Sequence, residues 1–236
     1  MQDMRYFREE GLYLDQAWDV YRDYFATQNS FLCQYNRIPT DERKNLFLMI
    51  LSRYKLLVRD GEYRIIGPNQ ALYIAYLDQT YKFISLMSLI EALFAEEAHV
   101  DFYQWLMMKK RKRRIFPIED GQDLEVLYRE YKLEYGARRF VLFFSRLDEG
   151  AQKFLLARIR IDSTQKAAEV VAQKLYIIRS EFVHQARPVL EFSDGVMFSK
   201  RHGDVLYSLL SLRDLQLLFE HGLLQHFCLT PDTRMI

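Results

Sequence analysis

Few residues in this chain can interrupt a helix or form the tight turns of a β-sheet. The 236 residues include only nine glycines and five prolines, too few for an all-β sandwich built from many short strands. Apolar residues recur instead at three- and four-residue spacing, as in the segment from Glu10 to Asn29. Half of the residues are hydrophobic, so a sizeable core can form. The sequence therefore predicts a mainly α-helical bundle with one or two short β-hairpins.

Capping residues and helix breakers set the expected helix boundaries. Thr40 or Asp41 can begin one helix, and Ser163 or Thr164 another. Gly136 lies inside a later helical pattern and weakens it by about 1 kcal/mol relative to alanine. Besides residues 10–29, the expected helices are residues 41–57, 70–98, 124–147, 151–161, 164–185 and 205–226.

Two Asp-Gly pairs predict tight hairpin turns, because both central positions of such a turn require positive φ. Asp60-Gly61 lies between two apolar runs, and Asp194-Gly195 lies within the segment VLEFSDGVMFS. The first hairpin would close an N-terminal helical extension of residues 1–67. The remaining residues, 68–236, are expected to form one helical domain that contains the second hairpin.

Charge and cysteine content exclude several classes of protein. The chain has 33 Lys and Arg against 32 Asp and Glu, a net charge of +1, so it is not a globally basic nucleic-acid binder. Cys33 and Cys228 lie far apart and offer no zinc-ribbon spacing, which favours a reducing compartment, with one long-range disulfide as the alternative. His221 and His226 lack further ligands at suitable spacing, so we expect no metal and no cofactor. Without a visible signal peptide or an apolar run of about 20 residues, we expect a cytoplasmic protein that contacts no membrane.

The helix expected before Pro188 carries more than one distinctive face. Its core stripe consists of Val171, Leu175, Ile178 and Phe182. A second, weaker apolar strip consists of Ala172, Tyr176 and Val183. Arg179 lies at one margin of this strip, and Ser180 and His184 lie at the other. A helix with two apolar faces packs against two neighbours, which are either another helix or a second subunit.

Arg179 and His184 are five residues apart and project about 140° from each other on a straight helix. One helix therefore cannot easily close both side chains on one small ligand. Two copies that meet across a two-fold axis could place two arginines and two histidines around one cleft. We expect a homodimer for this reason.

At this helix the sequence resembles a known family. The segment from Leu175 to His184, with Leu-Tyr followed by Arg, a polar residue, three further positions and His, is similar to the signature helix of the HEPN superfamily, especially its Apea-like branch. The segment FISLMSLIEALF, from Phe83 to Phe94, is similar to a second helix of that branch. The resemblance covers residues 71–188 and implies a HEPN-like domain; Gln185 stands where the family usually has glycine.

The resemblance implies a metal-independent endoribonuclease that acts as a homodimer, of the kind found among defence and toxin effectors. The 2′-OH of RNA would attack the phosphate and leave a 2′,3′-cyclic phosphate. His184 would transfer the proton, because a histidine can do so near neutral pH. Arg179 would stabilise charge on the phosphate, and Ser180 would bind the phosphate or hold the imidazole. The alternative is a non-catalytic HEPN module that binds RNA, a nucleotide or a partner protein such as an antitoxin.

Further residues are candidates for contact with single-stranded RNA. Tyr176 could stack on a base, although helix packing is commoner at such a position, and Arg187 is a nearby cation. A basic run comprises Lys109, Lys110, Arg111, Lys112, Arg113 and Arg114. This run could bind a phosphate backbone, signal nuclear import in a eukaryote, or form a solvated loop.

The motif also has explanations that involve no function. Arg179 and His184 could simply be cations placed near a helix C-terminus, where the helix dipole favours them. Glu91 could orient Arg179 through an ion pair, but a solvated carboxylate is the commoner arrangement and the one we expect. In an all-helical scaffold unrelated to the family, Arg179 and His184 would lie on unrelated solvent-facing surfaces.

Overall fold

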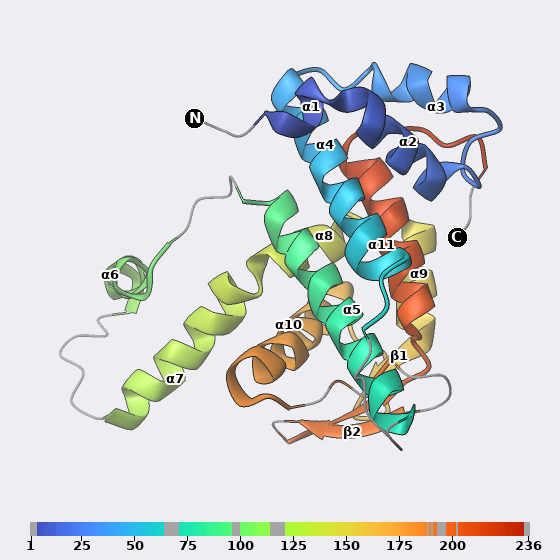
Figure 1. Cartoon of the computed structure of the whole chain (residues 1–236). Helices are drawn as coiled ribbons and strands as arrows, with labels where there is room; N and C mark the ends of the chain where they lie inside the picture. Colours follow the sequence, from blue (N-terminus) through green and yellow to red (C-terminus); the bar gives the residue numbers. More distant parts are fainter. Residues whose placement is uncertain are drawn as a thin grey trace.

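The expectation of a mainly helical protein is confirmed. The computed structural model describes residues 4–63, 71–95, 100–113, 121–187, 189, 191–192, 197–201 and 203–233. Helices make up most of this part, together with a small three-stranded antiparallel sheet (Figure 1). No helix in it combines the length and the apolarity needed to cross a bilayer.

The elements follow one another in chain order. The N-terminal helices are α1 (Arg5–Arg8), α2 (Glu10–Tyr21), α3 (Gln28–Tyr35), α4 (Asp41–Tyr54) and a π-helical turn η1 (Lys55–Arg59). The middle of the chain forms α5 (Ala71–Leu93), α6 (Phe102–Arg113), α7 (Gly121–Tyr131), a second π-helical turn η2 (Lys132–Gly136), α8 (Arg138–Ser145) and α9 (Glu149–Arg158). The last part forms β1 (Ile159–Ile161), α10 (Ala168–Gln185), β2 (Met197–Arg201), β3 (Asp204–Ser208) and α11 (Leu212–His226).

Short polar side chains fix where several helices begin. Thr40 caps α4, as expected, because its hydroxyl accepts a hydrogen bond from the backbone N–H of Arg43 at 3.3 Å. Ser211 and Asp214 form a capping box that starts α11 at Leu212. The expected cap of α10 at Ser163 or Thr164 is wrong, because α10 begins at Ala168 without a side-chain cap.

The expected hairpin around Asp60-Gly61 is wrong in its first arm. Residues Lys55–Arg59 continue α4 as the turn η1, with Val58 fully buried. The backbone N–H of Asp60 donates to the carbonyl of Lys55, and the side chains of these two residues form an ion pair. The backbone groups that a hairpin strand would use for pairing are therefore already engaged in helical hydrogen bonds. In the expected second arm, Glu62 and Tyr63 form no strand, and residues 64–66 lie outside the described residues.

A hairpin does form near the C-terminus, but at a different turn. Strand β2 pairs with β3 antiparallel, with Met197 opposite Ser208 and Arg201 opposite Asp204. The Asp194-Gly195 pair lies outside the described residues. Strand β3 is formed by residues that were expected to begin the last helix, and β1 by residues that were expected to end the helix over 151–161. Both are strands because they pair with each other, in a sheet of order β1-β3-β2.

Two of the expected helices are divided, and one segment without an expected helix is helical. The pattern over residues 10–29 ends at Tyr21, and α3 then begins at Gln28. The pattern over residues 124–147 is broken into α7, η2 and α8 at Gly136. Lys109–Arg113 belong to α6 and not to a loop, while their side chains and the whole of Arg114 lie outside the described residues.

One cluster of buried hydrophobic residues joins the N-terminal helices to the rest of the chain. Helix α11 runs beside α4 and α5 in the middle of the body (Figure 1). Phe47 of α4 packs against Phe227 with ring centroids 5.1 Å apart, and Tyr54 packs against Phe219 at 5.0 Å. The residues expected to form an N-terminal extension thus share their core with the last helix.

A carboxylate lies inside this core. Glu220 of α11 is only 2% exposed, and it accepts hydrogen bonds from the hydroxyls of Tyr54 at 2.6 Å and Tyr24 at 2.9 Å. Tyr21 donates to the backbone carbonyl of Glu220 at 3.1 Å. Burial, together with the carboxylate's charge, raises the pKa of all three tyrosines, so their hydroxyls stay protonated and remain donors.

Replacing Tyr54 by phenylalanine should destabilise the fold. The change removes a hydrogen bond to a buried charge, which contributes about 1.5–3 kcal/mol to the free energy of unfolding. Urea denaturation followed by circular dichroism measures the loss. Tyr207→Phe is the matched control: Tyr207 is half-buried on β3, and we expect a change within about 0.5 kcal/mol. Equal losses in the two variants would contradict the role of the Tyr54 hydroxyl.

Candidate functional site

A groove lies between α10 and the segment formed by α7 and η2. Helices α6 and α7 lie to one side of the helical body, and α10 faces them (Figure 1). The groove has a volume of about 560 Å³. Its lining includes three of the residues singled out from sequence: Tyr176, Ser180 and His184.

These three side chains line one groove because they recur at four-residue spacing on α10. His184, in the last turn, is exposed, and Ser180 is half-buried one turn earlier. The Tyr176 ring packs on Phe140 of α8, with centroids 5.6 Å apart. Burial raises the pKa of Tyr176 above its usual value, so its hydroxyl stays protonated. The arrangement offers a ligand an imidazole, a hydroxyl and an aromatic edge.

Gly136 makes the position of Tyr176 possible. A Cβ atom placed on Gly136 would lie 2.5 Å from the Tyr176 hydroxyl and 2.9 Å from the ring carbon that bears it. Any other residue at the end of η2 would therefore displace the ring or the backbone. The glycine that weakens the helical pattern is thus the residue that admits Tyr176 to the wall of the groove.

Arg179 faces away from this groove. Its Nη2 atom donates to Glu91 Oε2 on α5 at 2.8 Å, and the two side chains are 20% and 25% exposed. The Nε atom of Arg179 is buried and has no hydrogen-bond partner. The expectation of a solvated Glu91 is wrong, and the alternative of an ion pair is correct. Within one chain Arg179 and His184 do not meet, in agreement with their spacing of five residues.

The three carboxylates that line the groove each pair with a cation, whereas Lys132 pairs with no carboxylate among the described residues. Glu125 pairs with Arg129 at 2.5 Å, Asp204 with Lys174, and Glu181 with Arg187 at 3.4 Å. Lys132, in contrast, forms no ion pair within the part of the chain that the structure describes. Its Nζ atom lies 4.7 Å from the centroid of the Tyr128 ring, a cation–π distance.

Sequence reasoning missed Tyr128 and Lys132. Both line the groove, Tyr128 is 42% exposed, and Lys132 is exposed. The available signal was their four-residue spacing, which places an aromatic ring and a cation together on one helical face. The sequence did not indicate that this face lies opposite α10, because that depends on the break at Gly136.

Arg187 is engaged within the chain. It forms an ion pair with Glu181 and donates from Nη2 to the carbonyl of Lys200 at 3.2 Å. It is absent from the groove lining. The side chains of Lys109–Arg113 and all of Arg114 lie outside the described residues, so their expected contact with RNA stays a prediction.

The second apolar strip of α10 packs largely within the chain. Ala172 is fully buried and Tyr176 contacts α8, while Val183 remains 48% exposed. Of the two neighbours that the sequence left open, the structure thus supplies a helix, α8. Homodimer formation stays a prediction.

Other features bear on the expected chemistry. Cys33 and Cys228 are free and exposed, so the alternative of a disulfide between them is wrong. Across the described residues, no three His, Cys, Asp or Glu side chains gather in a way that could hold a metal ion. No protein-family model, curated protein or solved structure matches the chain.

Replacing Glu91 by glutamine should change how stability depends on pH. Burial raises the pKa of Glu91 above its ordinary 4.5, although Arg179 and Arg139 oppose this shift. The folded protein therefore binds this proton more tightly than the unfolded chain does. The stability that Glu91 contributes is present below its ordinary pKa and is lost as the pH rises through its folded-state pKa. We expect the unfolding free energy of wild type minus that of Glu91→Gln to fall as the pH rises from the ordinary pKa of 4.5 through the raised folded-state pKa of Glu91.

Urea denaturation at several pH values measures this difference. Glu149→Gln provides a control of opposite sign, because the hydrogen bond from Lys153 lowers the pKa of the exposed Glu149. For that variant the same difference should rise with pH. If the difference in unfolding free energy between wild type and Glu91→Gln also rose with pH, the ion pair with Arg179 would outweigh the burial of the carboxylate.

Proposed function

We propose that this chain is a metal-independent endoribonuclease that acts as a homodimer, with the groove beside α10 as its RNA-binding site. One observation carries the proposal: an exposed His184 lies one turn from Ser180, in a groove whose Lys132 forms no ion pair with the residues that the structure describes. The resemblance of α10 to the HEPN signature helix supports the same reaction and extends the proposal to a defence or toxin effector.

The groove suits a single strand of RNA. Tyr128 and Tyr176 offer aromatic surfaces to bases, and base–aromatic stacking tolerates any sequence. Lys132 offers a positive charge to the backbone, and each charge neutralised on a phosphate makes binding more sensitive to salt. The paired carboxylates on the rim repel phosphate less than free ones would.

The proposed reaction uses the nucleophile that RNA carries. His184 accepts the proton of the 2′-OH, and the 2′-oxygen forms a bond to phosphorus while the bond from phosphorus to the 5′-oxygen breaks. The leaving 5′-oxygen takes a proton from the protonated imidazole of the second copy. The products are a 2′,3′-cyclic phosphate and a 5′-hydroxyl. Ser180 would donate a hydrogen bond to a non-bridging phosphate oxygen.

Arg179 has a defined place in this proposal. Its ion pair with Glu91 holds the guanidinium at the α5 side of α10. In a homodimer, the arginine of one copy would face the phosphate held at the groove of the other. Glu91 would then act as a positioning residue for Arg179.

A second function is favoured by the same ion pair. Arg179 is largely buried and engaged, and it lies away from the groove that contains His184. A module that binds single-stranded RNA without cleaving it, the alternative expected from the resemblance, needs only the groove, its aromatic rings and Lys132. The two functions differ in whether bound RNA is cut.

Incubation with single-stranded RNA in EDTA tests the proposal. We expect cleavage to 2′,3′-cyclic phosphate ends, and a loss of rate of about 100-fold or more in His184→Ala, the usual effect of removing a general base. Arg179→Ala should lose a comparable factor. Lys132→Gln should weaken RNA binding, measured by fluorescence anisotropy, and make it less sensitive to salt.

Arg160→Gln is the matched control, because Arg160 is an exposed cation on β1 outside the groove. It should cut and bind like wild type. Sedimentation velocity reports the oligomeric state in parallel. RNA binding that depends on Lys132 without any cleavage would favour the non-catalytic module, and a strictly monomeric protein that cleaves RNA would contradict the dimer.

A further inference from the structure

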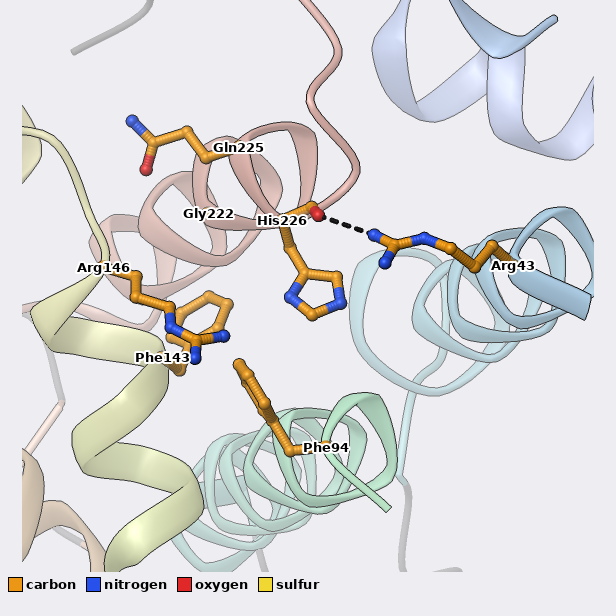
Figure 2. A pocket seen from close by; sticks show the side chains of 7 residues that line it. All are labelled: Arg43, Phe94, Phe143, Arg146, Gly222, Gln225 and His226. Atoms are coloured by element: carbon orange, nitrogen blue, oxygen red, sulfur yellow. Dashed lines mark hydrogen bonds between the residues drawn. The ribbon is translucent and has the colours of Figure 1, made fainter. Parts of the chain in front are cut away.

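A second cavity lies where the ends of α5, α8 and α11 meet α4 (Figure 2). Its volume is about 280 Å³, and it shares no lining residue with the groove beside α10. The lining consists of Arg43, Phe94, Phe143, Arg146, Gly222, Gln225 and His226. Among the residues that the structure describes, this lining contains two cations and no carboxylate.

Both arginines lack a counter-ion in the part of the chain that is described. Arg43 of α4 donates from Nη2 to the backbone carbonyl of His226 at 3.0 Å, while its buried Nε atom has no hydrogen-bond partner. Arg146, just after α8, is exposed, and its side chain makes no hydrogen bond to the described residues. A guanidinium has five N–H donors, so both arginines retain donors for a ligand. Two like charges around a small cavity repel each other, and an anion between them removes that repulsion.

Aromatic faces hold both guanidinium groups in place. Arg43 lies over the Phe227 ring at 5.3 Å, and Arg146 lies over the Phe94 ring at 5.4 Å. In Figure 2 the imidazole of His226 lies between the two arginine side chains, with Phe94 below it. The cations are therefore positioned before any ligand arrives, which reduces the entropy lost on binding.

His226 supplies a third polar group without a third charge. Its imidazole packs edge-on against Phe94, with ring centroids 5.1 Å apart. Burial, followed by the charges of Arg43 and Arg146, lowers the pKa of His226 to about 4. At neutral pH the ring is therefore neutral and presents one N–H donor and one acceptor nitrogen.

The glycine of α11 brings the cavity walls together. A Cβ atom on Gly222 would lie 2.5 Å from Cζ of Phe143 and 2.8 Å from a methyl carbon of Leu147. Only a glycine lets the end of α8 approach α11 this closely, and this approach carries Arg146 to the cavity. Asp148, two residues after Arg146, lies 2.8 Å from the His221 imidazole and caps α9.

We propose that this cavity is a binding site for a phosphate group, presented by inorganic phosphate or by a small phosphate monoester such as a nucleoside 5′-monophosphate. Two guanidinium groups match a phosphate that carries nearly two negative charges, because Arg146 can donate two parallel hydrogen bonds to its oxygens while Arg43 retains the N–H groups of Nη1. A neutral imidazole donor complements a third oxygen. The volume exceeds that of the ion alone, so a sugar attached to the phosphate has room.

Titration with inorganic phosphate, followed by isothermal calorimetry at low ionic strength, tests the site. Wild type should bind, and Arg146→Gln should weaken binding about tenfold or more, the loss expected when one charge-assisted donor is removed. Arg146 is exposed and makes no side-chain hydrogen bond to the described residues, so this variant should stay folded. Arg160→Gln removes an exposed cation elsewhere and should bind within about twofold of wild type.

Adenosine 5′-monophosphate, titrated in the same way, distinguishes the two ligand sources. Tighter binding than inorganic phosphate indicates a phosphate monoester, and equal binding indicates the free ion. The ring-proton NMR signals of His226 should shift with phosphate, while those of the buried His221 should not. His184→Ala should bind phosphate like wild type, so this test is independent of ribonuclease activity. The proposal would be overturned if no binding were seen at about 20 mM phosphate, because a functional site would bind more tightly than that. It would also be overturned if Arg160→Gln weakened binding as much as Arg146→Gln.

Discussion

The arrangement of this chain depends on a carboxylate that water cannot reach. Glu220 lies in the core at 2% exposure, where an unpaired charge would cost several kcal/mol. Arg213, on the same helix, lies 4.0 Å from the carboxylate. The hydroxyls of Tyr54 and Tyr24, from parts of the chain 166 and 196 residues away, compensate the rest of that cost. The compensation works in only one placement of α11 against the N-terminal helices. The same placement puts Gly222 against α8 and His226 beside Arg43, so the buried charge also fixes one wall of the phosphate cavity.

The sequence predicted most helices, whose patterns are local, although the expected cap at Ser163 or Thr164 is wrong. It missed the elements that depend on distant partners. Thr40 starts α4 because a cap involves only neighbouring residues. Asp60-Gly61 looked like a hairpin turn, but the buried Val58 continues the helix into η1. Residues Asp204–Ser208 carry a helix-compatible pattern and yet form β3, since β1 and β2 offer pairing on both edges. Nothing in the local sequence of β3 indicates that the strand beginning at Ile159 pairs with it.

The candidate site shows the same division. Spacing along one helix brought Tyr176, Ser180 and His184 to one face and separated Arg179 from them, as the sequence indicated. The opposite wall, with Tyr128 and Lys132, could not be predicted, because its position depends on a break between two helices. The ion pair of Arg179 with Glu91 was the less favoured alternative from sequence. Surface carboxylates are usually solvated, and only the packing of α5 on α10 made this one an exception.

Two glycines position α8, and through it both sites. Gly136, just before α8, leaves room for Tyr176, and Gly222 of α11 leaves room for Phe143 in α8 itself. A Cβ atom at either position would lie 2.5 Å from the facing side chain. Phe140 faces the Tyr176 side, and Phe143 faces the α11 side. A helix of only eight residues, Arg138–Ser145, thus has one side against a wall of the groove and one against a wall of the cavity. Because packed cores do not deform continuously, an alanine at Gly136 has to move either the Tyr176 ring or the start of α8. The groove and the cavity therefore share one short rigid element, although they share no lining residue.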